Sequence, residues 1–153
     1  MKEGPFRVRV FEIGDKTKKT LVITHGFSGC ALSYYTMIHT LAKSYRLVLF
    51  DNCSWGLNTR LQTCEGLESP VKAEAWLIDW LVKVFDELDL PEKFFLAGHS
   101  MGGYLMSLYA STAPQKVGGL FLLSPAGTEP YDPVTYDPYN ILHPFQLKPM
   151  TRK

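Results

Sequence analysis

The pattern of apolar and polar residues predicts five short β-strands. Residues 6–10 (FRVRV) alternate apolar and basic side chains, which is typical of a half-exposed strand near the edge of a sheet. Residues 21–24 (LVIT) and 46–50 (RLVLF) are apolar and rich in β-branched or long side chains, as in buried parallel strands. Two further apolar runs, at residues 93–97 (KFFLA) and 119–123 (GLFLL), predict the remaining strands.

The segments between these strands have the apolar spacing of helices. Residues 33–44 carry apolar side chains at the spacing of one helix face. A second, longer helix is predicted to begin at Ser69 and Pro70, because serine caps free N–H groups and proline suits the first helical turn. Pro91 closes that helix, and residues 104–111 predict a third one.

Strands that alternate with helices predict an α/β fold, in which a mostly parallel sheet has helices on both faces. The 153 residues are 46% hydrophobic, which suits one packed core. We expect residues 1–128 to form that core. Six of the ten prolines follow Leu123, so residues 129–153 are expected to be a proline-rich tail or the start of a cap or lid segment.

The charge balance argues against a nucleic-acid partner. Sixteen basic and fifteen acidic side chains leave a formal net charge of +1, so there is no basic field to attract phosphate backbones. Arginines interrupt the apolar residues near the N-terminus, which excludes a signal-peptide core or a membrane span there. The sequence therefore predicts a cytoplasmic protein, with peripheral contact to a membrane or lipid left open.

The cysteines and histidines indicate neither a disulfide framework nor a metal site. The three cysteines are odd in number and lack a C-x-x-C spacing, so we expect free thiols. None of the four histidines lies at ligand spacing from another histidine or a cysteine. No metal or organic cofactor is expected.

The strongest chemical signal lies between strand 93–97 and the helix after it, in the run Gly98-His99-Ser100-Met101-Gly102. This G-x-S-x-G pattern suits a serine on a sharp strand-to-helix turn, where glycine two positions to either side avoids the neighbouring backbone. The turn exposes the Ser100 hydroxyl as a nucleophile. It also places the Met101 N–H at a helix N-terminus, where an oxyanion would form. The alternative is a glycine-rich turn that merely packs closely.

Together with the loop that begins at His25 and Gly26, these residues resemble the α/β-hydrolase family, over about residues 20–130. The resemblance implies that the loop is an oxyanion loop with the Phe27 N–H as second donor. Residues 51–58 (DNCSWGLN) resemble the family turn D-x-x-G-x-G-x-S, with serine and asparagine in place of the first glycine and the final serine. Residues 124–127 (SPAG) resemble the family's exit toward a cap domain.

Within the family, the segments GHSMGGYLMSLYASTAP and LFLLSPAGTEP resemble a lipid-directed branch of esterases and lipases. The resemblance implies a serine hydrolase that acts on a small-molecule ester or acyl-lipid substrate. Some relatives of that branch carry asparagine as the nucleophile and are non-enzymatic activators, and Ser100 argues against that role. An inactive fragment or a lipid- or protein-binding member is the alternative.

The triad partners of Ser100 are not evident. In this fold the acid and then the histidine follow the nucleophile, and only 53 residues follow it here. His143, with Asp132 before it, keeps that order and is the candidate base. His25 is expected to be a structural histidine, and the His99 side chain to leave the turn on the side opposite Ser100. We expect a missing C-terminal half or a partner chain, which would also cover the edge of strand 119–123.

Overall fold

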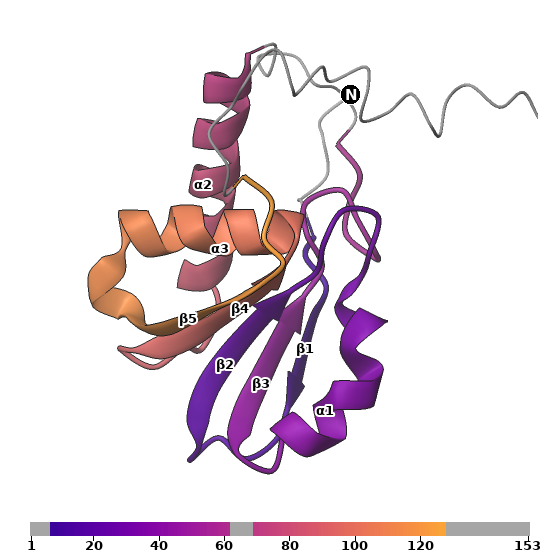
Figure 1. The fold of residues 1–153 in the computed structure, drawn as a ribbon, viewed down its shortest axis with the longest axis vertical. Helices are drawn as coiled ribbons and strands as arrows, with labels where there is room; N and C mark the ends of the chain where they lie inside the picture. The colour runs from indigo at the N-terminus through magenta and orange to yellow at the C-terminus, as the bar shows by residue number, and fades with distance from the viewer. Residues whose placement is uncertain (1–6, 62–68, 128–153) are drawn as a thin grey trace, which may run out of the picture.

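The computed structural model describes residues 7–61 and 69–127, which form one five-stranded sheet with helices on both faces (Figure 1). The strand order is β1-β3-β2-β4-β5; β1 is antiparallel to β3, and every other pairing is parallel. This confirms the predicted α/β class. The strands are β1 (Val10–Ile13), β2 (Lys19–Thr24), β3 (Tyr45–Phe50), β4 (Phe94–His99) and β5 (Val117–Leu123); the helices are α1 (Tyr35–Leu41), α2 (Pro70–Asp86) and α3 (Met101–Thr112), with short 3-10 turns at Ala31–Tyr34 and Pro114–Lys116.

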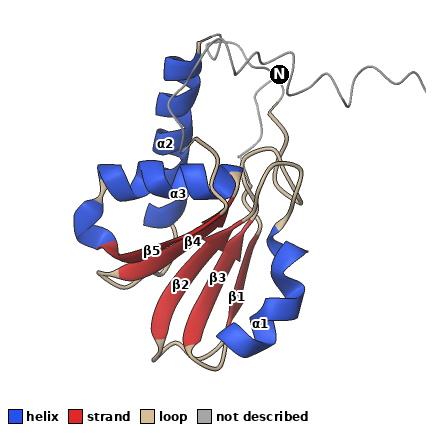
Figure 2. Cartoon of the chain, in the orientation of Figure 1, coloured by secondary structure: helices blue, strands red, loops and turns tan. Residues whose placement is uncertain are grey.

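The central strands divide their side chains between two apolar cores. On β2, Val22 packs into a core with α2 and α3, whereas Leu21 and Ile23 pack into a second core on the α1 side. Figure 2 shows the same arrangement, with α1 on one face of the sheet and the two longer helices on the other. Because successive side chains of a strand point to opposite faces, an apolar run is buried on both sides.

Helix α2 begins where the sequence predicts. The Ser69 side chain accepts a hydrogen bond from the Lys72 N–H at 3.2 Å, and Pro70 is the first helical residue. The buried face of α2 brings Phe85 against the rings of Phe94 and Tyr109, with centroids 5.7 and 4.5 Å away. This aromatic cluster fixes α2 and α3 on the sheet.

The first strand was predicted at the wrong residues. It spans Val10–Ile13 rather than residues 6–10, because only these residues face β3. Before Val10 the neighbouring segment is the loop after β3, where the Asp51 N–H donates to the Arg9 carbonyl at 3.1 Å. Residues 7–9 therefore pair with the loop after β3 and not with a strand.

Strand β5 ends the described part of the sheet, pairing with β4 alone. Its last three side chains, Phe121, Leu122 and Leu123, are exposed. Residues 129–153, predicted as a tail or cap segment, lie outside the described residues.

Candidate active site

Ser100 lies at a sharp turn between β4 and α3. Its backbone has φ 52° and ψ −118°, outside the regions that L-residues favour. The glycines on either side are required by close packing: a Cβ on Gly98 would lie 2.3 Å from the Gly102 carbonyl oxygen, and one on Gly102 would lie 2.5 Å from the His25 carbonyl oxygen. The structure thus has the strained geometry that the G-x-S-x-G pattern predicts.

Hydrogen bonds from the end of β5 hold this turn. The Ser100 N–H donates to the Leu123 carbonyl at 3.1 Å, and the Ser100 carbonyl accepts from the N–H groups of Tyr104 and Ala126 at 3.2 and 2.9 Å. Ser124, which follows β5, itself has φ 43°. The conformation of Ser100 is therefore imposed by two adjacent strands and a helix, not by the local chain alone.

The loop after β2 packs directly against this turn. A Cβ on Gly26 would lie 2.9 Å from the His99 Nδ1 and 3.1 Å from the Ser100 Cβ. Within residues 7–61 and 69–127, neither the Phe27 N–H nor the Met101 N–H has a hydrogen-bond acceptor. Met101 is the first residue of α3, where N–H groups have no partner within the helix and the helix dipole favours negative charge.

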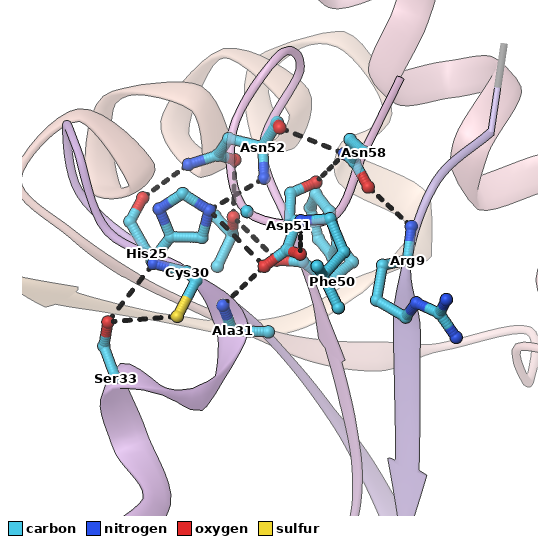
Figure 3. A network of polar contacts seen from close by, with 12 residues as sticks. Arg9, His25, Cys30, Ala31, Ser33, Phe50, Asp51, Asn52 and Asn58 are labelled. Atoms are coloured by element: carbon cyan, nitrogen blue, oxygen red, sulfur yellow. Dashed lines mark hydrogen bonds and ion pairs between the residues drawn. The ribbon is translucent and has the colours of Figure 1, made fainter. Parts of the chain in front are cut away.

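His25 is buried, and both of its ring nitrogens are engaged. Figure 3 shows its ring beside Asn52 and Asp51. The Asn52 N–H donates to Nε2 at 2.9 Å, which leaves the proton on Nδ1, 2.7 Å from the Gly26 carbonyl oxygen. Burial lowers the pKa of His25. The Gly26 carbonyl and the Asp51 carboxylate act in the opposite direction, but their effect is smaller. His25 is a neutral imidazole that joins two loops and has no free nitrogen to act as a base.

The carboxylate of Asp51 is likewise occupied by hydrogen bonds, in this case from backbone N–H groups. One carboxylate oxygen accepts from the Ala31 N–H at 2.6 Å and the other from the Leu57 N–H at 2.8 Å. Figure 3 shows this carboxylate between the start of the first helical turn and its own loop. Asp51 therefore tethers its loop, and no imidazole other than that of His25 lies against it among the described side chains.

Asn58 has a role that the sequence pattern did not reveal. Its amide nitrogen donates to the carbonyl groups of Asp51 and Asn52 at 2.6 and 3.0 Å, and its carbonyl oxygen accepts from the Arg9 N–H at 2.5 Å. A serine here, as in the family turn, has one hydroxyl and could not make all three bonds. The signal in the sequence was that asparagine stands at position 58, where the family turn has its final serine.

The His99 side chain is directed toward the loop after β2, since a Cβ on Gly26 would lie 2.9 Å from its Nδ1. That it leaves the turn on the side opposite the Ser100 hydroxyl stays a prediction. His99 lines a cavity of about 440 Å³ together with the loop after β2. His39 is exposed on α1, away from this cavity.

The remaining predicted site residues, Asp132 and His143, lie outside the described residues. Over the ranges that the structure covers, no cluster of three or more His, Cys, Asp or Glu side chains could hold a metal ion. In the same ranges no helix has both the length and the apolar character needed to cross a bilayer.

The fold and this turn define a class of protein: an α/β protein with a serine at the carboxyl end of a parallel strand, ahead of a helix. The chain belongs to the alpha/beta hydrolase fold family, whose profile matches residues 19–145.

Curated relatives share this part of the chain. A 1-acylglycerol-3-phosphate O-acyltransferase of Arabidopsis thaliana is 34% identical over 109 residues, which are 71% of this chain and 25% of that protein. Abhydrolase domain-containing protein abhd-5.2 of Caenorhabditis elegans is 34% identical over 118 residues, 77% of this chain and 26% of the relative. The chain thus spans about a quarter of the length of these relatives.

Solved structures confirm the fold. A bacterial membrane phospholipase A matches with a TM-score of 0.71 and 23% identity, over 83% of this chain and 39% of that one. The chain therefore corresponds to less than half of such a domain.

Proposed function

We propose that this chain is the nucleophile-bearing part of a serine hydrolase that acts on carboxylic esters or acyl lipids. Ser100 Oγ attacks the carbonyl carbon of the ester, its proton passes to a general base, and the alcohol leaves with a proton to give an acyl-enzyme. Water then attacks the acyl-enzyme and releases the acid.

The observation that carries this proposal is the backbone conformation of Ser100. A serine at φ 52° costs about 1–3 kcal/mol, and such strain persists where the surrounding structure imposes it. Gly98 and Gly102 leave no room for side chains, so the turn is built for this conformation. A close-packed structural turn would not need an accessible, strained serine at its apex.

The Phe27 and Met101 N–H groups are the proposed oxyanion hole. A Cβ on Gly26 would lie 3.1 Å from the Ser100 Cβ, so the loop that carries Phe27 lies close to the proposed nucleophile. Met101 adds the N-terminal end of the α3 dipole. Losing one such donor costs about a hundredfold to a thousandfold in turnover in a well-studied protease.

The base and the acid are proposed to come from outside the described residues. His25 has both nitrogens engaged, and His39 is exposed on α1 and does not line the cavity. His99 directs its Nδ1 toward Gly26 in the loop after β2 and is proposed to leave the turn on the side opposite the Ser100 hydroxyl. His143 and Asp132 are the candidates within the sequence; a longer chain or a partner chain is the alternative source. Without a base the serine stays protonated, which costs roughly a million-fold in turnover.

The proposed substrate class rests on the relatives and on the surface beside Ser100. The Arabidopsis relative is described as an acyltransferase for an acylglycerol phosphate, and the phospholipase structure shares the fold. Phe27 is 68% exposed and packs edge-on against Trp55, with centroids 4.8 Å apart. This exposed aromatic pair suits an acyl chain or a lipid surface. Cytoplasmic location remains a prediction.

Labelling with a fluorophosphonate probe tests the proposal, because the probe reacts appreciably only with an activated serine. We expect the chain to be labelled and the Ser100→Ala variant not to be. Ser111→Ala, which removes an exposed hydroxyl on α3, is the matched control and should label like the wild type. His143→Ala then tests the candidate base within this chain.

The second candidate function is that of a binding protein without catalytic activity. It is favoured by the hydrogen bonds of both His25 ring nitrogens, which leave this histidine unable to act as a base. Absence of labelling in a folded preparation would reject the idea that this chain is a working hydrolase by itself, and would leave a part of a longer hydrolase or a binding protein. Retained binding of a fluorescent fatty-acyl ester by the same preparation would then support a binding role.

A further inference from the structure

The cavity of about 440 Å³ beside the turn is lined by Phe27 of the exposed aromatic pair and, for the most part, by polar side chains and glycines. Ser28, Ser33, Tyr34 and His99 contribute polar groups to its wall. The cavity lies within the volume range of small-molecule sites, where a few polar groups fix the orientation of a ligand. The polar groups of the lining therefore influence which part of a substrate enters the cavity.

The two serine hydroxyl groups of this wall have unused bonding capacity. The exposed Ser28 hydroxyl has no hydrogen bond to any described residue. Ser33 Oγ accepts from the Cys30 N–H at 3.2 Å and has only a weak 3.9 Å contact with the Cys30 sulfur, so its O–H can donate to a ligand. Tyr34 is already bonded within the protein, because it donates to the Thr24 carbonyl at 2.9 Å and its oxygen interacts with the His99 backbone N–H.

Among the described residues, no side chain that lines the cavity carries a fixed charge. This part of the lining contains no lysine, arginine, aspartate or glutamate, and its buried histidine, His25, is neutral because burial lowers its pKa and Nε2 accepts the Asn52 N–H. A phosphate would lack the arginine or lysine partners that usually bind it. Uncharged donors and acceptors match a hydroxyl-bearing, uncharged ligand.

Gly26, which lines the cavity, connects it to the proposed nucleophile. A Cβ on Gly26 would lie 3.1 Å from the Ser100 Cβ and 2.9 Å from the Nδ1 of His99, another lining residue. We infer that this cavity receives an uncharged, hydroxyl-rich alcohol portion of an ester, such as a glyceryl group, and that Ser28, Ser33 and His99 select it. Naming this the alcohol portion rests on the proposed function; the hydroxyl preference rests on the cavity itself.

Direct binding to the Ser100→Ala chain tests this inference without any need for turnover. Monobutyrin, ethyl butyrate and 1-butyrylglycerol 3-phosphate share an acyl group and differ only in the alcohol. Their Kd values can be measured by NMR from the shifts of the histidine imidazole signals. We expect monobutyrin to bind roughly tenfold more tightly than ethyl butyrate, which corresponds to one or two net hydrogen bonds.

Three substitutions test the named residues. Ser28→Gly removes a hydroxyl where φ is 58°, so glycine fits without strain; Ser33→Ala and His99→Phe remove the other polar groups. Each should reduce the preference for monobutyrin by about threefold or more and leave ethyl butyrate binding unchanged. Ser111→Ala should change neither. Because Ser28→Gly keeps the loop conformation, it remains informative if another variant fails to fold.

The outcomes separate this inference from the proposed function. Equal binding of monobutyrin and ethyl butyrate, or tighter binding of the phosphate ester, would overturn the inference even if Ser100 is labelled. A monobutyrin preference that depends on Ser28 and Ser33 would uphold the inference even if the wild-type chain is not labelled.

Discussion

At the scale of single residues, Ser100 and His25 are held by their surroundings in states that they would not adopt alone. Ser100 has a positive φ because the glycines beside it and the carbonyl of Leu123 fix the turn. His25 is neutral inside the protein because burial disfavours its charged form and Nε2 accepts the Asn52 N–H. Each of these states changes the free energy of unfolding by an amount that can be measured.

Replacing Ser100 with glycine should stabilise the fold. Glycine adopts φ 52° without strain, although it loses more backbone entropy on folding, so we expect a net gain of about 1 kcal/mol in the free energy of unfolding. Urea denaturation measures this. Ser100→Ala keeps the strain and should show no gain; equal stability of both variants would contradict strain at Ser100.

Replacing His25 with alanine should destabilise the protein by about 2–4 kcal/mol, because it leaves the buried Asn52 N–H without an acceptor and opens a cavity. His39→Ala on the exposed face of α1 should change stability by less than about 0.5 kcal/mol. Thermal unfolding of both variants tests this. Similar small effects for the two would show that the Asn52 contact contributes little.

The lowered pKa of His25 predicts a pH dependence. Below the ordinary value of 6.5 the unfolded chain binds a proton that the folded protein resists, so stability is full above this pH and falls as the pH drops below it. Urea midpoints between pH 5 and 8 measure the effect. His25→Gln should flatten the curve in this window, and an unchanged curve would assign the effect to another group.

At the scale of elements, α2 and α3 are joined by one polar contact besides their apolar packing. The Tyr104 hydroxyl on α3 donates to the Glu74 carboxylate on α2. Tyr104 lies one turn after Ser100 and its N–H bonds to the Ser100 carbonyl. This contact thus braces the helix that carries the proposed oxyanion donor.

This contact should be lost in alkali. The hydrogen bond to Glu74 is the main cause that raises the pKa of Tyr104 from 10.0 to about 12. The folded state favours the protonated phenol, so its contribution is full below pH 10 and disappears as the pH rises toward 12. Tyr104→Phe should cost about 1 kcal/mol at pH 7 and remove this alkaline loss, whereas exposed Tyr35→Phe should not.

At the scale of the whole molecule, the described sheet has an open edge at β5. Phe121 is 46% exposed, and the Phe95 ring lies beside it, with 6.2 Å between the centroids. An exposed apolar strand edge is a template for pairing with another chain. The sequence predicts this from a strand that is not followed by another strand pattern.

We therefore expect the chain to self-associate as its concentration rises, in sedimentation velocity measurements. Phe121→Lys should weaken this association, because a charge on an edge strand opposes pairing. Val71→Lys, at an exposed position on α2, is the matched control and should leave it unchanged. A monomer at all concentrations would show that β5 does not act as an open edge.

The sequence alone determined the features whose cause is local. Helix α2 begins at its predicted cap because Ser69 and Pro70 act within one turn. The Ser100 turn followed from the glycines beside it, and the central strands from their apolar runs.

Only the tertiary structure decided the features that depend on distant partners. Val10 begins β1 because the segment opposite Arg9 is a loop and not a strand. Asn52 fixes the tautomer of His25, although 27 positions separate them. The hydrogen-bond partner of a buried polar group is set by which strand ends meet, and no local pattern in the chain contains that information.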